Sequence, residues 1–157
     1  ANRTIPDFLE TGFWQPRPTT PTLASAMDVG NPSNMERFFH VFDNPETLLD
    51  TLRAVSVTDE QITNQIRSEY LDNQILCCPH TATALHVYRE FSNKEKKETH
   101  WCIVATAHPS KFEQTVEPII GEEIVVPERL RALLELDSSY VTIDPELNQL
   151  IDAIASA

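Results

Sequence analysis

Residues 101–113 have the sequence WCIVATAHPSKFE. The run Trp101–Ala105 is apolar throughout, which is typical of a strand buried on both faces. A turn that contains Thr106 and His108 follows, and Ser110-x-x-Glu113 is a capping pattern that starts a helix. In open α/β sheets, ligands bind at the carboxyl ends of strands, beside helix N-termini. We therefore predict a central strand whose following turn faces a ligand, although a turn whose polar groups bond only to the backbone would have the same sequence.

Helix signals are frequent on both sides of this stretch. Gly12 is suited to end a short helix, and capping boxes at Ser33-x-x-Glu36 and Thr58-x-x-Gln61 predict two helix starts. Further helices are expected to begin after Asp43-Asn44, at Pro79, at Pro127, and at Pro145 with Asp144 as the cap. Short strands are expected at 22–29, 54–57 and 101–105, and a charged loop at 92–98.

The predicted fold class is α/β, with many helices and two or three short strands. So few strands make a poor sheet alone, and helices around a central strand belong to a layered architecture. The chain is therefore expected to be part of a larger sheet, with an apolar edge that favours self-association or a partner. We expect a Pro-rich lead-in over 1–22, an α/β part facing the active site over 23–120, and C-terminal helices over 121–157.

The composition excludes several classes of function. The 157 residues include 12 Lys and Arg against 24 Asp and Glu, a formal charge of −12 that repels nucleic acids and anionic membrane surfaces. Apolar runs are too short to span a bilayer, and no leader pattern opens the chain. Three cysteines, two of them adjacent, do not resemble a disulfide framework. We therefore expect the protein to be in a reducing compartment, the cytoplasm. The missing initiator Met fits a processed start or a cut from a longer protein.

Three further patterns have two interpretations each. The segment Asp28–Asn34 could hold an anion at a helix start, but plain capping explains it as well. Cys77-Cys78-Pro79-His80 contains zinc-ligand residue types, but no second pair completes four ligands, so we expect no metal, and we place Cys102 in the core. The stripe Phe38/Phe39/Phe42 is expected to be core.

Four segments taken together resemble the C-terminal portion of the threonine synthase family. They are Pro6–Gly12, Met27–Asn34, Pro79–Ala82 and Ala105–Phe112, and they occur in the matching order over nearly the whole chain. The resemblance implies a pyridoxal-phosphate enzyme of the tryptophan-synthase-β-like, three-layer fold. Such enzymes convert O-phosphohomoserine and water to threonine and phosphate, with the cofactor as electron sink.

The resemblance also implies roles for particular residues. Thr106 matches the hydroxyl residue that meets the pyridine nitrogen of the cofactor, to which a hydroxyl donates a neutral hydrogen bond. A segment near the active site supplies Asn31, Ser33 and Asn34, which are expected to place cofactor or substrate. Weaker candidates for lining the pocket or pairing with the substrate phosphate are His80, Thr81, His108 and Lys111.

Two departures from the family limit these expectations. Cys78 stands where the family usually has Asp, which puts a charge-based role of that position in doubt. The Schiff-base lysine and the phosphate-binding loop are absent, so we expect a fragment that is inactive alone. Two alternatives stay open: another pyridoxal-phosphate lyase, such as a serine or threonine dehydratase, and a non-catalytic acidic interaction module.

Overall fold

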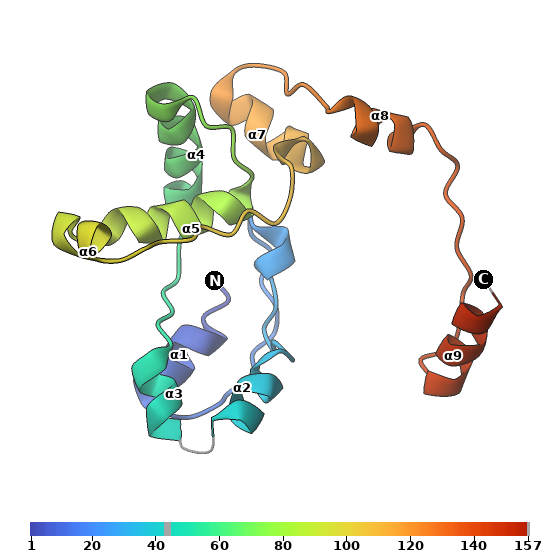
Figure 1. The fold of residues 1–157 in the computed structure, drawn as a ribbon, viewed down its shortest axis with the longest axis horizontal. Helices are drawn as coiled ribbons and strands as arrows, with labels where there is room; N and C mark the ends of the chain where they lie inside the picture. Colours follow the sequence, from blue (N-terminus) through green and yellow to red (C-terminus); the bar gives the residue numbers. More distant parts are fainter. Residues whose placement is uncertain (43–44, 157) are drawn as a thin grey trace. The chain divides into compact units, whose positions relative to one another are not determined.

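Helices dominate the computed structural model, which describes residues 1–42 and 45–156 (Figure 1). The chain divides into two compact units, Ala1–Ile124 and Val125–Ala157. Every residue of the candidate site lies in the first unit. The predicted cap Asp43-Asn44 lies outside the described residues.

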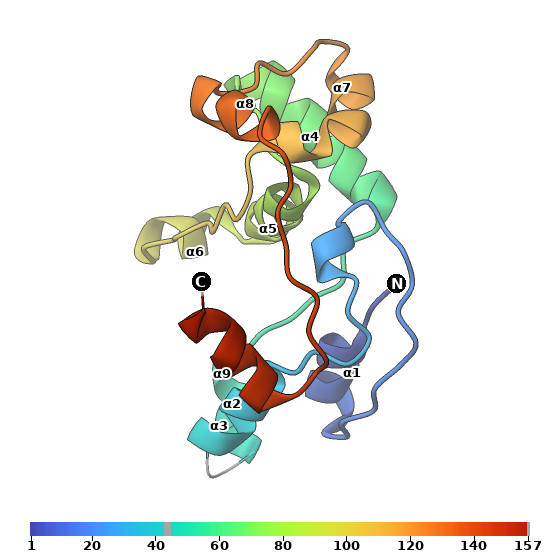
Figure 2. The same cartoon turned by 90° about the vertical axis from the view of Figure 1, so that its right-hand side faces the viewer.

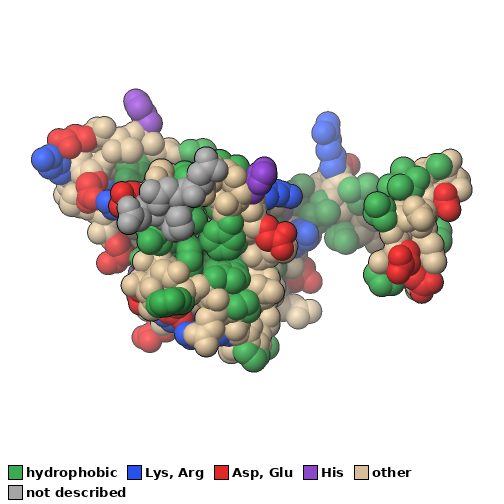
Figure 3. Space-filling view, turned by 90° about the horizontal axis from the view of Figure 1, so that it is seen from below, with side chains coloured by type: hydrophobic (Ala, Val, Ile, Leu, Met, Phe, Trp, Pro, Cys, Tyr) green, Lys and Arg blue, Asp and Glu red, His purple; other side chains and the backbone are tan. Residues whose placement is uncertain are grey.

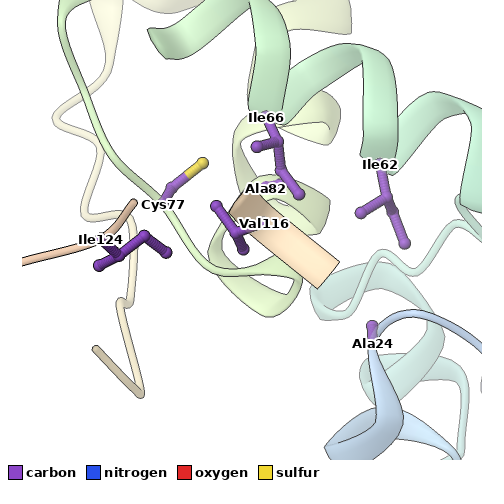
Figure 4. Packing of buried hydrophobic residues seen from close by; sticks show 7 residues of the cluster. All are labelled: Ala24, Ile62, Ile66, Cys77, Ala82, Val116 and Ile124. Atoms are coloured by element: carbon purple, nitrogen blue, oxygen red, sulfur yellow. The ribbon is translucent and has the colours of Figure 1, made fainter. Parts of the chain in front are cut away.

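One core of the first unit forms where three helices meet. These are α4 (Asp59–Asn73), α5 (Pro79–Glu90) and α7 (Glu113–Ile120), and α4 packs against both others (Figures 1 and 2). Two of the predicted starts are confirmed: Thr58 and Gln61 form the capping box of α4, and Pro79 opens α5. The buried side chains that fill this core are Ala24, Ile62, Ile66, Cys77, Ala82, Val116 and Ile124 (Figure 4).

A second cluster joins α1 (Thr4–Thr11), α2 (Met35–Val41) and α3 (Pro45–Thr51). Its buried members are Phe8, Met35 and Leu48, and the rings of Phe8, Trp14 and Phe39 meet edge to face at centroid distances of 5.4–5.7 Å. Gly12 ends α1 in the left-handed conformation, as predicted. The phenylalanine stripe is core only in part: Phe38 and Phe42 pack partly buried, whereas Phe39 is 42% exposed.

The predicted strands at 22–29, 54–57 and 101–105 are not found among the described residues. Ser25–Met27 forms the 3-10 helix η1, and the other two segments run without regular structure. A strand needs a neighbour to bond its backbone groups, and no second strand occurs in residues 1–42 or 45–156. Val104 is 66% exposed and Cys102 is exposed as well, so the apolar run 101–105 is not a core strand here. The α/β expectation is thus confirmed only as a helix-rich fold.

Several local predictions also need correction. Residues 92–98 form no loop, because a capping box between Ser92 and Glu95 starts α6 (Asn93–Glu98). The starts of α2 and α7 carry no side-chain cap, and a 3-10 helix η2 (Pro109–Phe112) precedes α7. Asp144 does not cap α9; its carboxylate accepts a hydrogen bond from Gln149 Nε2 at 3.0 Å.

The second unit contains α8 (Glu128–Leu134) and α9 (Leu147–Ala155). None of its described residues, 125–156, is buried, and apolar side chains lie on its surface (Figure 3). On α9 these are Leu147, Leu150, Ile151 and Ile154, which share one helix face and are 46–70% exposed. Across the described part of the chain, no helix combines the length and the apolar character needed to cross a membrane.

Candidate functional site

The ring of His80 lies between η1 and Phe112, each next to or within a segment that the sequence singled out. His80 is the second residue of α5, and only 3% of it is exposed. Its Nε2 accepts a hydrogen bond from the backbone N–H of Ala26 in η1 at 2.9 Å. The ring also packs against Phe112 of η2, with 4.7 Å between ring centroids. The N-terminus of α5 therefore contacts η1, which directly precedes Asp28–Asn34, and Phe112 at the end of the segment Ala105–Phe112.

Burial sets the charge of this ring. The pKa of His80 is lowered from its ordinary value of 6.5, mainly because burial penalises the imidazolium form. Asp28 and the backbone of Ala24 act in the opposite direction without reversing the shift. At neutral pH the ring is therefore uncharged, which leaves Nε2 able to accept the hydrogen bond of Ala26.

Cys78 and Thr81 complete the buried start of α5. Cys78 Sγ lies 3.3 Å from Thr81 Oγ1 and 3.9 Å from His80 Nδ1. Thr81 is 8% exposed and Cys78 is fully buried. Three polar side chains thus meet one another inside the chain, where they orient the first turn of α5.

The segment that begins at Asp28 is anchored at its start and open at its end. Asp28 accepts hydrogen bonds from the backbone and hydroxyl of Thr22, at 2.7 and 2.6 Å. The carbonyl of buried Gly30 accepts from Thr4 Oγ1 at 2.7 Å. Beyond these anchors, the sequence-predicted residues Asn31, Ser33 and Asn34 are all exposed.

The segment Thr106–Lys111 contains one capping side chain and two exposed polar groups. His108 Nδ1 accepts a hydrogen bond from the backbone N–H of Ser110 at 3.2 Å, so His108 caps η2. Thr106 and Lys111 are exposed. Their hydroxyl and ammonium groups can therefore reach a ligand, whereas His80 and Thr81 are buried.

A cavity of about 740 Å³ lies elsewhere on the first unit. Its wall includes Thr83 and Val87 of α5 and Phe91, which directly follows this helix, together with Val55 and Met27. None of the eight predicted site residues lines it. The sequence did not predict this cavity, although the spacing of Thr83 and Val87 on α5 gives a signal for one of its walls. Polar and charged side chains also line it, namely Arg53, Ser56, Gln61, His86 and Glu90.

The cysteines do not form a metal site with their neighbours. Within residues 1–42 and 45–156, no three His, Cys, Asp or Glu side chains gather as ligands of one ion. Cys77 and Cys78 are buried, and burial, followed by the charge of Glu69, raises the pKa of the Cys77 thiol to about 12. A thiol with that pKa is a poor nucleophile near neutral pH.

We expect one thiol of the native chain to react with iodoacetamide at pH 8, and that thiol to be Cys102. Cys77 and Cys78 are expected to react only when the chain unfolds, because both are buried. Mass spectrometry of peptides after timed labelling identifies the sites, and the variant Cys102→Ser is expected to lose the fast phase. Fast labelling of Cys77 in the native chain would contradict this interpretation.

Comparisons with known proteins find threonine synthases that are similar over most of the chain. A family described as "Threonine synthase, C-terminal" matches residues 81–154. The threonine synthase of Buchnera aphidicola subsp. Schizaphis graminum is 35% identical over 150 residues, which cover 96% of this chain and 34% of that protein. That of Escherichia coli K12 is 36% identical over 146 residues, covering 92% of this chain and 33% of that protein.

Solved structures show the same likeness in the fold. The crystal structure of threonine synthase from Escherichia coli is similar with a TM-score of 0.74 and 28% identity, over 99% of this chain and 36% of that one. A pyridoxal-phosphate-bound threonine synthase from Brucella melitensis has a TM-score of 0.62 at 22% identity, over 96% and 37%, which shows a likeness of fold. The chain spans about a third of the length of the relatives it matches.

Proposed function

Because this chain is similar in sequence and in fold to the C-terminal third of threonine synthases, we propose that it forms that part of a pyridoxal-phosphate lyase. The proposed reaction converts O-phospho-L-homoserine and water to L-threonine and phosphate. One observation carries the proposal: the likeness to threonine synthases extends over 96% of the chain, far beyond any single motif.

The residues of this chain fit part of a cofactor site. The exposed hydroxyl of Thr106 can donate a neutral hydrogen bond to the pyridine nitrogen and so orient the ring. When bound, pyridoxal phosphate supplies an electron sink for elimination and replacement chemistry. The cation of Lys111 is exposed and suits the substrate phosphate. We assign Asn31, Ser33 and Asn34 to placing cofactor or substrate.

The proposed catalytic lysine lies outside this chain. None of Lys94, Lys96, Lys97 or Lys111 stands in a context that matches the Schiff-base lysine. Within the proposal, residues 23–120 face the active site, 1–22 lead into them, and 121–157 are C-terminal helices of a cytoplasmic enzyme. The 157 residues alone are expected to be inactive, and their exposed apolar surface favours self-association or contact with the remainder of the enzyme.

Replacing Thr106 with Val is expected to lower kcat about tenfold, the effect of losing one hydrogen bond that orients the cofactor. The measurement is phosphate release from O-phosphohomoserine by the protein encoded when the reading frame is extended upstream of Ala1. The matched control is Thr99→Val, an exposed threonine at the end of α6, which is expected to leave kcat unchanged.

The same experiment separates the proposal from its alternatives. If the extended protein binds pyridoxal phosphate but releases no phosphate, the threonine synthase assignment falls and a serine or threonine dehydratase becomes the better reading. If no longer reading frame exists, an acidic interaction module replaces the enzyme. Equal kcat values for Thr106→Val and the parent would remove the assigned role of Thr106.

A further inference from the structure

The ring of His80 contacts both η1 and Phe112 of η2. Ala26, which donates to Nε2, lies in η1, just before the segment that carries Asn31, Ser33 and Asn34. Phe112, which packs on the ring, directly follows Lys111. His80 itself belongs to the first turn of α5. These segments are far apart in the sequence, so their mutual placement depends on tertiary contacts of this kind.

The contacts of His80 leave it poorly placed to bind a substrate. One ring nitrogen accepts from a backbone N–H, the other lies 3.9 Å from Cys78 Sγ, and the ring packs on an aromatic neighbour. With 3% of the residue exposed, a ligand could reach the ring only by displacing these groups. The ring is therefore a contact inside the protein.

Histidine combines two properties that no other residue offers at this place. Its Nε2 reaches the N–H of Ala26 as an acceptor, and its flat ring packs against Phe112. Glutamine keeps an acceptor at a similar reach but lacks the ring, and phenylalanine keeps the ring but lacks the acceptor. The two substitutions therefore test the two contacts separately.

We propose that His80 is a positioning residue, which holds η1 and η2 against the N-terminus of α5 and thereby places the side chains that flank them. In the enzyme, this role rests on the proposed function and acts through Thr106 and Lys111, not by contact with substrate. The contact with Ala26 requires an uncharged Nε2, because a protonated ring would present a donor to another donor.

The groups that face the ring determine how the contact depends on pH. From the η1 side these are Asp28 and the backbone of Ala24. The thiol of Cys78, the residue before α5, and the uncharged ring of Phe112 in η2 face it as well. The pKa of His80 is lowered in the folded chain, so the folded state favours the neutral ring. The stabilisation of the folded state by the neutral ring of His80 is complete above pH 6.5, the ordinary pKa of histidine, and is lost as the pH falls below that value.

The first test measures hydrogen exchange of the Ala26 amide in the 157-residue chain. We expect His80→Phe to lower the protection factor of this amide about five- to tenfold, the effect of one lost hydrogen bond, and His80→Gln to restore part of it. His86→Gln, on the same helix but partly exposed, is the matched control and is expected to change nothing. In the parent chain, protection of Ala26 is expected to fall below pH 6.5, a readout that remains if His80→Phe does not fold.

The second test uses the upstream-extended protein. His80→Gln is expected to lower kcat about tenfold through misplaced groups, with KM within about twofold of the parent. A raised KM at unchanged kcat would mean that the ring binds substrate and would overturn the proposal. So would an Ala26 amide whose protection is independent of both pH and substitution. If the extended parent releases no phosphate, the proposed function fails, and the exchange data still decide whether His80 anchors η1.

Discussion

Replacing Gly30 with Ala is expected to lower the free energy of unfolding by about 3 kcal/mol, the upper part of the range for overpacking. A Cβ at this position would overlap the backbone carbonyl of Arg17 and crowd Pro18. These are backbone atoms that Gly30 itself fixes, because its carbonyl accepts from Arg17 N at 3.1 Å and its N–H donates to Thr19 Oγ1 at 3.1 Å. A backbone shift that relieves the overlap would therefore break the hydrogen bonds between Gly30 and residues 17–19.

The matched control is Gly12→Ala. Gly12 has a φ of +75°, yet a Cβ there would meet nothing within 4 Å. The cost is then only that of a left-handed alanine, about 1 kcal/mol. Urea unfolding followed by the fluorescence of Trp14, which packs on Phe8, measures both variants. Equal losses for the two glycines would show that the close approach of Arg17 does not determine the residue at position 30.

Local signals in the sequence predicted several helix ends, although the caps expected at the starts of α2, α7 and α9 did not form. The capping box of Thr58 and Gln61, the proline that opens α5 and the glycine that ends α1 all act within one helical turn. Each can be read without knowing the rest of the fold. The capping box of Ser92 and Glu95 is of the same kind, and the short α6 was missed only because its many charges suggested a loop.

Predictions that depend on distant residues were less successful. The apolar run 101–105 resembles a buried strand only if other strands flank it, and the described residues contain none. The strand expected at 22–29 did not form, and the need for glycine at position 30 comes from the close approach of the Arg17 backbone, which is a distant residue. In the candidate site, the sequence alone selected three segments but did not predict the contacts at His80. Ala26 lies far before His80 in the sequence and Phe112 far after it, so only the fold brings them together.

Replacing Arg89 with Met is expected to lower the free energy of unfolding by about 2 kcal/mol, the order of the loss of hydrogen bonds to a charged group. The cost is below that of a fully buried ion pair because the Arg89 side chain is 46% exposed. Glu69 of α4 is 1% exposed, and its Oε1 accepts from Arg89 Nε at 3.0 Å and from Arg89 Nη2 at 2.6 Å. Gln65 and Asn73 also donate to this carboxylate, at 2.7 and 2.9 Å, but neither neutralises it. Loss of Arg89 therefore leaves a buried charge without its counter-ion.

We expect the loss of stability to come from the buried charge of Glu69 without its counter-ion, and not from the loss of the arginine side chain itself. A second substitution separates these two effects. The double variant Glu69→Gln with Arg89→Met is expected to be more stable than Arg89→Met alone, because an amide costs less to bury than a carboxylate. Arg67→Met, an exposed arginine of α4, controls for the change of side chain and is expected to have almost no effect. Urea unfolding of all four chains provides the comparison. If the double variant were the least stable, the pair itself would stabilise the packing of α4 on α5, and the buried charge of Glu69 would not be the source of the loss.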